Sequence, residues 1–228
     1  MEHFAQQIVG RVLKPGDHLD AEPDLASQFG VSKPTVRESL QNLASLGLVR
    51  VQQGKRTTVL EDADWDFMAP VVQEAFQKTG RGYELAEQLH EVRIILEASS
   101  AERAAERAEP AHVDRLRELI EAMAKVTGTT QDLAEFLRLD RAFHEMVARA
   151  SKNRALLQVI RNVHHFLSHN WHITTITAEE LPHLTDLHRA VADAIERGDA
   201  ADARHAMEAH LSEVAAKQAA RRLREEPQ

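Results

Sequence analysis

Residues 25–40 read LASQFGVSKPTVRESL. Their pattern predicts two helices joined by a tight turn at Gly30, because glycine readily adopts the left-handed conformation that such a turn needs. Val31 is expected to fill the gap between the helices, and Ser32 is a good N-cap for the second one. The residues before the turn share one apolar face: Leu25, Ala26 and Phe29.

The second of these helices is expected to present polar and basic side chains outward. Its inward residues recur at helical spacing: Val36, Leu40, Leu43 and Leu46. This spacing leaves Lys33, Thr35, Arg37 and Gln41 on the outer face, near the N-terminal half, where such a helix reads the major groove of DNA. The alternative is a protein-binding winged helix with an incidental basic face.

Residues 47–60 read GLVRVQQGKRTTVL and predict a β-hairpin. Two runs rich in β-branched residues, 48–52 and 56–60, flank a short polar tip. A basic tip of this kind can reach the minor groove or the phosphate backbone. Helices and hairpin together predict a winged helix-turn-helix, and the residues expected to contact double-stranded DNA are Ser32, Lys33, Thr35, Arg37, Gln41, Gln53, Gly54 and Lys55.

Charge supports DNA binding only locally. The chain carries a formal net charge of −8, with a pI near 5.9, so it is not a general binder of polyanions. Residues 33–60 nevertheless contain five basic residues and one acidic residue, a local balance of +4. So small a basic surface favours two copies acting together, which predicts a homodimer on a palindromic operator.

Length and composition predict two domains in a soluble, cytoplasmic protein. The 228 residues are enough for two cores, and the composition changes after Leu60. We therefore expect a winged helix-turn-helix in residues 1–62 and an all-α domain in residues 63–228. Cysteine is absent, which excludes disulfides and thiolate metal sites. No basic leader precedes an apolar run and no apolar stretch is of membrane length, so we expect no membrane partner.

The chain beyond residue 62 lacks the alternation of β-strands. Its Gly, Pro and polar punctuation predicts helices over residues 65–78, 83–107, 112–126, 132–150, 154–171, 182–197 and 200–222. The expected fold class is therefore mainly α, with a helical bundle after the winged helix-turn-helix.

Four polar residues are predicted to point into the core of that bundle. The apolar stripe of helix 132–150 includes Asp140 and His144, one turn apart. The same periodicity places His188 and His210 on the buried stripes of two later helices. Unpaired burial would cost each group on the order of 1–3 kcal/mol, so they need a common partner. A divalent metal fits, because imidazoles with one carboxylate suit Zn, Ni, Mn or Fe and leave positions for water or an incoming carboxylate.

Other interpretations of these residues remain open. The chain has 13 histidines, and a buried histidine is commonly satisfied by hydrogen bonds alone. A competing cluster also exists, because His165, His169 and His172 share another face of their helix, beside His164. Two further functions are conceivable: a metal-dependent hydrolase tethered to a DNA-binding head, and a purely architectural DNA-binding dimer. The inward set offers no additional general base for hydrolysis.

Several motifs resemble a known family. The segments QIVGRVLKPGDHL (residues 7–19) and VSKPTVRESL (31–40) resemble the GntR family of bacterial transcription regulators. The segments EVRIILE (91–97), DRAFH (140–144) and LHRAV (187–191) resemble the helical effector domain of its FadR branch, the FCD domain. The resemblance covers nearly the whole chain. It implies an effector-responsive DNA-binding regulator, commonly a repressor, and not an enzyme.

The resemblance also implies roles for particular residues. In this branch the aspartate and three histidines that match Asp140, His144, His188 and His210 commonly bind a divalent metal beneath an effector pocket. Arg93 is implied to pair with the carboxylate of a small organic acid, and a guanidinium is well shaped for this. Its alternative partner is Glu97, one turn further on.

Two further positions qualify the resemblance. Lys33 stands where family members usually have arginine, and lysine keeps the charge but lacks the fork that reads guanine with two hydrogen bonds. Trp65 and Asp66, followed by Pro70 and Val71, resemble regulators of sugar-acid catabolism. This implies a sugar acid as one candidate effector.

Overall fold

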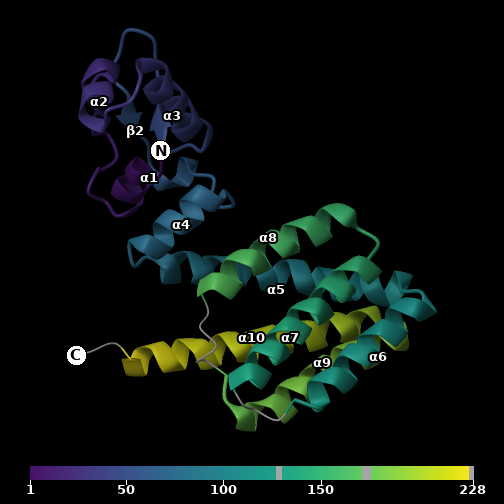
Figure 1. Cartoon of the computed structure of the whole chain (residues 1–228). Helices are drawn as coiled ribbons and strands as arrows, with labels where there is room; N and C mark the ends of the chain where they lie inside the picture. Colours follow the sequence, from purple (N-terminus) through teal and green to yellow (C-terminus); the bar gives the residue numbers. More distant parts are fainter. Residues whose placement is uncertain (127–129, 171–175, 226–228) are drawn as a thin grey trace. The chain divides into compact units, whose positions relative to one another are not determined.

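The computed structural model describes residues 1–126, 130–170 and 176–225 (Figure 1). For residues 130–131, 168–170 and 217–225 it describes only the backbone. Contacts divide the chain into two compact units, Met1–Glu87 and Gln88–Gln228, which we call the N-terminal unit and the helical unit. The change in composition predicts a boundary after residue 62. The contacts extend the first unit beyond it, because α4 (Pro70–Lys78) packs against α1 (Glu2–Val9).

The N-terminal unit contains the predicted winged helix-turn-helix. α2 (Glu22–Phe29) and α3 (Lys33–Ser45) are joined at Gly30, which has the left-handed φ of +63°. Ser32 caps α3, because its hydroxyl accepts a hydrogen bond from the Thr35 amide at 3.3 Å. β1 (Val49–Arg50) pairs antiparallel with β2 (Thr58–Val59). The hairpin is confirmed, although its paired strands are shorter than the β-branched runs that predicted them.

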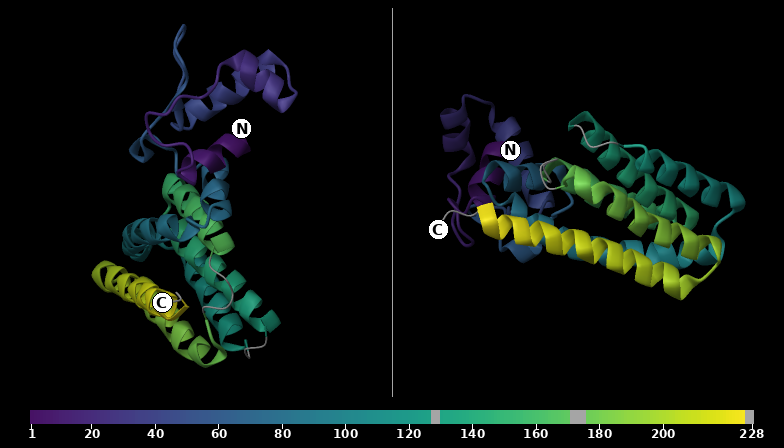
Figure 2. Two further views of the ribbon diagram at one scale, coloured as in Figure 1. Left: turned by 90° about the vertical axis from the view of Figure 1, so that its left-hand side faces the viewer. Right: turned by 90° about the horizontal axis from the view of Figure 1, so that it is seen from below.

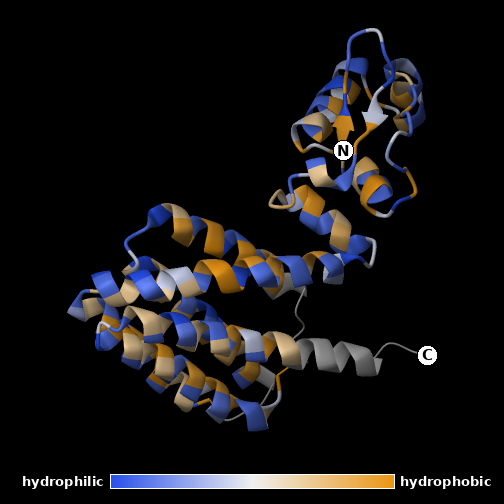
Figure 3. Ribbon diagram, turned by 180° about the vertical axis from the view of Figure 1, so that it is seen from behind, coloured by the Kyte–Doolittle hydropathy of each residue, from blue (hydrophilic) through white to orange (hydrophobic). Residues whose placement is uncertain are grey.

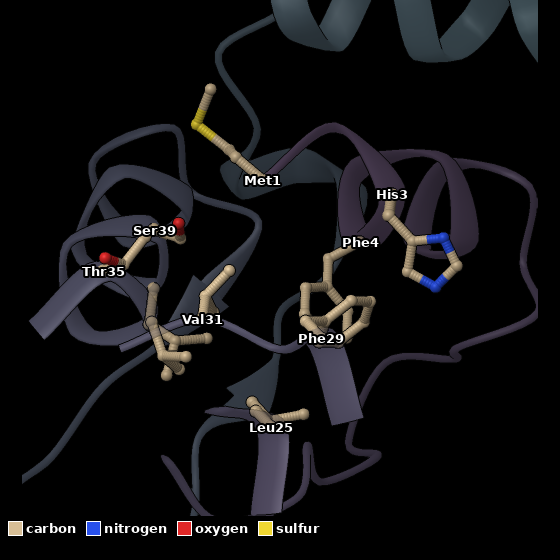
Figure 4. Close-up of a pocket in the computed structure, with 10 residues that line it drawn as sticks. Met1, His3, Phe4, Leu25, Phe29, Val31, Thr35 and Ser39 are labelled. Carbon is tan, nitrogen blue, oxygen red and sulfur yellow. The ribbon is translucent and has the colours of Figure 1, made fainter. Parts of the chain in front are cut away.

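Val31 does not fill the gap between α2 and α3, which corrects the sequence prediction, because it is 42% exposed. Phe29, on the apolar face of α2, is 40% exposed. The ring of Phe29 makes edge contacts with those of His3 and Phe4, at centroid distances of 5.5 and 5.6 Å. These residues line an apolar cavity of about 310 Å³ that α1, α2 and α3 share (Figure 4). Three further residues that line this cavity are at most 6% exposed: Leu25, Val36 and Leu40.

The segment after the hairpin begins its helix later than predicted. A short 3-10 turn, η1 (Asp62–Asp64), comes first, and α4 starts only at Pro70 because Ala69 before the proline is extended. This segment passes close to Gly47, whose φ is +72°. A Cβ at Gly47 would lie 1.8 Å from the Asp64 carbonyl oxygen, so glycine is required there.

The helical unit is the predicted all-α bundle. It contains most of α5 (Gly82–Arg107), followed by α6 (Pro110–Ala124), α7 (Thr130–Ala150), α8 (Arg154–Asn170), η3 (Ala178–Glu180), α9 (Leu181–Glu196) and α10 (Ala200–Glu225). α6 packs against α7 and α9, α7 packs against α8, and α9 lies along α10 (Figure 2).

The core of the helical unit forms because each helix buries one face. Hydrophobic and hydrophilic residues alternate along these helices (Figure 3), as expected for amphipathic helices in a bundle. Phe136, Phe143 and Met207 are among the largest fully buried side chains. Across the described ranges, every helix is too short or too polar to cross a lipid bilayer.

Candidate functional site

Four side chains from three helices meet inside the helical unit. α7 contributes Asp140 and His144, α9 contributes His188 and α10 contributes His210. Each offers one possible ligand atom, and these atoms all lie within 4.8 Å of one another. The three histidines are at most 2% exposed, whereas the Asp140 side chain is 25% exposed. The structure therefore brings together the four residues that the sequence analysis grouped as metal ligands.

The imidazoles direct Nε2 toward a shared space. His188 Nε2 lies 3.0 Å from Asp140 Oδ1, and His144 Nε2 lies 3.6 Å from the same oxygen. His210 Nε2 is 3.2 Å from His144 Nε2. In a hydrogen bond only one of those two nitrogens can keep its proton, whereas a cation between them accepts both lone pairs. Three nitrogens and one carboxylate are a donor set that suits Zn, Ni, Mn or Fe.

Electrostatics gives Asp140 and His210 the protonation states that metal ligands need. Burial would raise the pKa of Asp140, but His144 and His188 hold that pKa well below its usual range. Burial, together with the neighbouring imidazoles of His188 and His144, lowers the pKa of His210 well below its usual value. Asp140 is therefore ionised and His210 neutral at neutral pH, and metal binding requires both states.

Two of the imidazoles also have a contact on Nδ1, the ring nitrogen that does not face the shared space. His188 Nδ1 donates to the Leu184 carbonyl oxygen at 2.7 Å, and His144 Nδ1 lies 2.5 Å from Glu97 Oε2. A partner on Nδ1 fixes the tautomer that presents Nε2 to a metal. The close approach of His144 Nδ1 to Glu97 Oε2 is an ion-pair contact without hydrogen-bond geometry, and Nδ1 of His210 is buried without a hydrogen-bond partner in the described part of the chain. The residues present thus fit a divalent metal ion.

Glu97 of α5 is a buried carboxylate beside this cluster. It is 1% exposed, and its Oε1 accepts hydrogen bonds from Arg93 Nε at 2.6 Å and from His164 Nε2 at 2.7 Å. Burial would raise the pKa of Glu97, but Arg93, His144 and His164 hold that pKa well below its usual range. One ionised carboxylate therefore contacts side chains from α5, α7 and α8.

Arg93 forms the salt bridge with Glu97 that the sequence analysis raised as the alternative to effector binding. The residue is 7% exposed and contacts Glu97 through Nε. Among the described residues, its two terminal nitrogens have no hydrogen-bond partner. The salt bridge therefore leaves the forked end of the guanidinium available.

The competing histidine cluster lies only partly within the described residues. His164 is buried against Glu97, whereas its neighbour His165 is exposed. The side chain of His169 and the whole of His172 lie outside the described residues.

Sequence reasoning missed the roles of Glu97 and His164 beside the metal cluster. A signal existed for Glu97, because it lies on the same stripe of α5 as the buried Ala101 and Ala104. No pattern within one helix indicates that Glu97 meets His144 and His164 on two other helices.

The residues expected to contact DNA are exposed in the N-terminal unit. They lie at the start and on the outer face of α3 and at the tip of the hairpin: Ser32, Lys33, Thr35, Arg37, Gln41, Gln53, Gly54 and Lys55. Arg37 keeps 69% of its side chain exposed and bonds Glu22 of α2 twice, through Nε to Oε1 at 3.2 Å and Nη2 to Oε2 at 2.7 Å. The sequence analysis did not identify Glu22 as the partner of Arg37.

Comparison with known families gives two matches. The profile described as "Bacterial regulatory proteins, gntR family" matches residues 1–59, which hold α1, the helix-turn-helix and the hairpin. The FCD domain profile matches residues 88–213, which hold the four clustered residues together with Arg93 and Glu97.

Three relatives are similar over most of their length. LutR, an HTH-type transcriptional regulator of Bacillus subtilis (strain 168), is 32% identical over 209 residues, covering 89% of this chain and 91% of that protein. A protein of Escherichia coli K12, whose name assigns it provisionally to regulation of the L-lactate dehydrogenase operon, is 34% identical over 206 residues, covering 89% and 78%. The HTH-type transcriptional repressor NanR of Escherichia coli is 29% identical over 224 residues, covering 94% and 81%.

The fold is also similar to that of a solved structure. Streptococcus agalactiae GntR matches with a TM-score of 0.51 at 24% identity, covering 93% of this chain and 98% of that one. At this identity the likeness concerns the fold alone.

Proposed function

This chain belongs to the GntR family of bacterial transcription regulators and carries an FCD domain, and we propose that it is an effector-responsive repressor acting as a homodimer on a palindromic operator. The family consists of DNA-binding regulators, not enzymes, and this excludes the alternative of a metal-dependent hydrolase. Because operator DNA lies in the bacterial cytoplasm, the proposed regulator acts there.

The support for operator binding is the exposed start of α3. Lys33, Thr35 and Arg37 lie within its first turns, directly after the Ser32 cap, and Lys55 lies at the tip of the hairpin. Side chains at these places reach base edges and phosphates in winged helix-turn-helix proteins. Each copy offers few cations, so two copies on two half-sites give the affinity that one copy lacks.

The single observation that carries the sensory function is the convergence of Asp140, His144, His188 and His210. We propose that these four residues hold a divalent ion, Zn, Ni, Mn or Fe. When bound, the ion supplies a Lewis-acidic centre with open positions for a carboxylate oxygen. Arg93 supplies paired donors for the same carboxylate through its terminal nitrogens.

The proposed effector is a small organic acid. A relative assigned by name to the L-lactate dehydrogenase operon makes L-lactate the first ligand to test. The sequence around Trp65 and Pro70 resembles that of sugar-acid regulators, so D-gluconate is the second. Either acid would change operator affinity only to the extent that it binds the two arrangements of the DNA-binding units differently.

Two measurements test this function. Metal analysis should find close to one divalent ion per chain, and thermal shift should find L-lactate or D-gluconate stabilising the metal-loaded protein. A gel shift with DNA from upstream of the protein's own gene should show a complex that the same acid weakens. Failure to bind that DNA would contradict the operator proposal, and a complex unaffected by either acid would contradict the effector class.

A further inference from the structure

We propose that Glu97 is a positioning residue that holds His144 for the metal and Arg93 for the effector, and so couples the binding of the two. The inference rests on the proposed function, because it assumes that Asp140, His144, His188 and His210 hold a metal. It concerns a residue outside that set.

Glu97 orients the ring of His144. Glu97 Oε2 lies 2.5 Å from His144 Nδ1, so His144 presents Nε2 toward Asp140 and His210. His188 has a neutral carbonyl behind its Nδ1, whereas His144 has a carboxylate. An anionic partner on the outer nitrogen raises the basicity of an imidazole ligand and fixes its ring. Glu97 should therefore strengthen metal binding through His144.

Glu97 also orients the guanidinium of Arg93. Glu97 Oε1 accepts from Arg93 Nε at 2.6 Å, and this contact fixes the plane of the guanidinium. The terminal nitrogens have no partner among the described residues, so the fork that binds a carboxylate in two places stays free. His164 Nε2, at 2.7 Å from the same oxygen, holds Glu97 in place from α8.

The charges around Glu97 link the binding of metal and anion. Arg93 contributes one positive charge, and Glu97 and Asp140 contribute one negative charge each. Without a metal these three charges sum to −1. Burial would lower the pKa of His144, but Glu97 and Asp140 raise it, and a proton there brings the sum only to zero. The metal-free group therefore does not attract an incoming carboxylate. A divalent ion changes the net charge to +1, which a monoanionic effector neutralises. Buried charges need such compensation, so metal and monoanion should favour each other's binding.

The test uses Co²⁺ as the metal probe on the full-length protein. Glu97→Gln should lower Co²⁺ affinity by about 10- to 100-fold, measured by competition with a chromogenic chelator. The visible absorption of bound Co²⁺ should also change, because His144 is no longer held in one orientation. The matched control is Glu91→Gln, an exposed glutamate on the same helix, which should bind Co²⁺ as the wild type does.

A second variant controls for the possibility that Glu97→Gln fails to fold. Glu97→Gln leaves Arg93 buried without its carboxylate, which can destabilise the core. The double substitution Arg93→Met with Glu97→Gln removes both charges, and it should still show the reduced Co²⁺ affinity and altered spectrum. Either variant, if folded and binding Co²⁺ with wild-type affinity and spectrum, overturns the inference.

Coupling is measured with L-lactate, D-gluconate and acetate as anion probes. In the wild type, an anion that binds should tighten Co²⁺ binding, and Co²⁺ should tighten anion binding by the same factor. Glu97→Gln should lower that factor, because Arg93 is no longer held in place for the anion, although the charge of the ion still attracts it. A factor unchanged from the wild type overturns the coupling role of Glu97. A wild type that binds Co²⁺ but shows no coupling to any of the three anions also overturns it. A wild type that binds no Co²⁺ overturns the proposed metal site itself.

Discussion

Replacing His144 and His210 together by alanine should abolish the dependence of folding stability on metal. Both side chains are buried, and their Nε2 atoms are 3.2 Å apart. The double variant loses two of the four predicted ligands. The two that remain, Asp140 and His188, already hydrogen-bond each other at 3.0 Å and make a poor site alone.

The size of the effect follows from linkage. An ion that binds only the folded chain stabilises it by about 4 kcal/mol when its free concentration is ~1,000 times Kd. In a chain of this size, 1 kcal/mol corresponds to about 2–4 °C in Tm, so a saturating ion should raise the Tm of the wild type by roughly 8–16 °C. The double variant should show a rise near zero.

This prediction is checked by calorimetry, which measures the Tm for unfolding of the helical unit. The wild type, the double variant and the control His205→Ala are each compared in EDTA and in Zn²⁺, Ni²⁺, Mn²⁺ or Fe²⁺. His205 is an exposed histidine on α10, so its loss should leave the metal-dependent rise intact. A double variant that keeps the rise, or a wild type that responds to none of the ions including Fe²⁺, would refute the assignment of these four ligands.

The remaining predictions concern DNA, effector and pH. Arg37→Ala should weaken operator binding by about 1–3 kcal/mol in gel shifts at fixed salt, whereas Lys55→Ala should weaken binding to specific and non-specific DNA alike. Equal effects of the two substitutions would contradict the division between base and phosphate contacts. Arg93→Lys should lower effector affinity about tenfold in binding titrations, because lysine lacks paired donors. Operator affinity without effector should not change, and an unchanged effector response would remove Arg93 from the pocket. Burial, together with the nearby Arg93 charge, lowers the pKa of His90 from 6.5 to about 4. The folded state therefore favours neutral His90, and its contribution of about 3 kcal/mol is present above pH 6.5 and lost as the pH falls to about 4. Denaturant unfolding in EDTA should show that the free energy of unfolding falls less between pH 7 and pH 4.5 in His90→Gln than in the wild type. An equal fall in both proteins would contradict this.

The winged helix-turn-helix could be predicted from the sequence because its signals are local. Gly30 at the turn, Ser32 as the cap and β-branched runs around a polar tip act within a few residues of one another. Val31 was misplaced for the opposite reason. Its apolar character does not show whether the neighbouring helices cover it, and it lies 42% exposed beside a cavity that Leu25 and Leu40 also line.

The four clustered residues could be grouped because helical periodicity shows which side of a helix faces the core. Asp140 and His144 share a face at one turn of spacing, and His188 and His210 lie on buried stripes of their own helices. Four inward polar groups need partners, and this need linked three helices before any fold was known.

Periodicity determined the inward faces of the helices that carry Asp140, His144, His188 and His210, and so the need of these groups for a partner. Only the tertiary structure decided which buried residues meet, because packing of helices far apart in sequence sets those contacts. It placed Glu97 of α5 between Arg93, His144 and His164, and Glu22 of α2 against Arg37. Each pairing depends on the angle and register between two helices, and neither helix encodes these by itself.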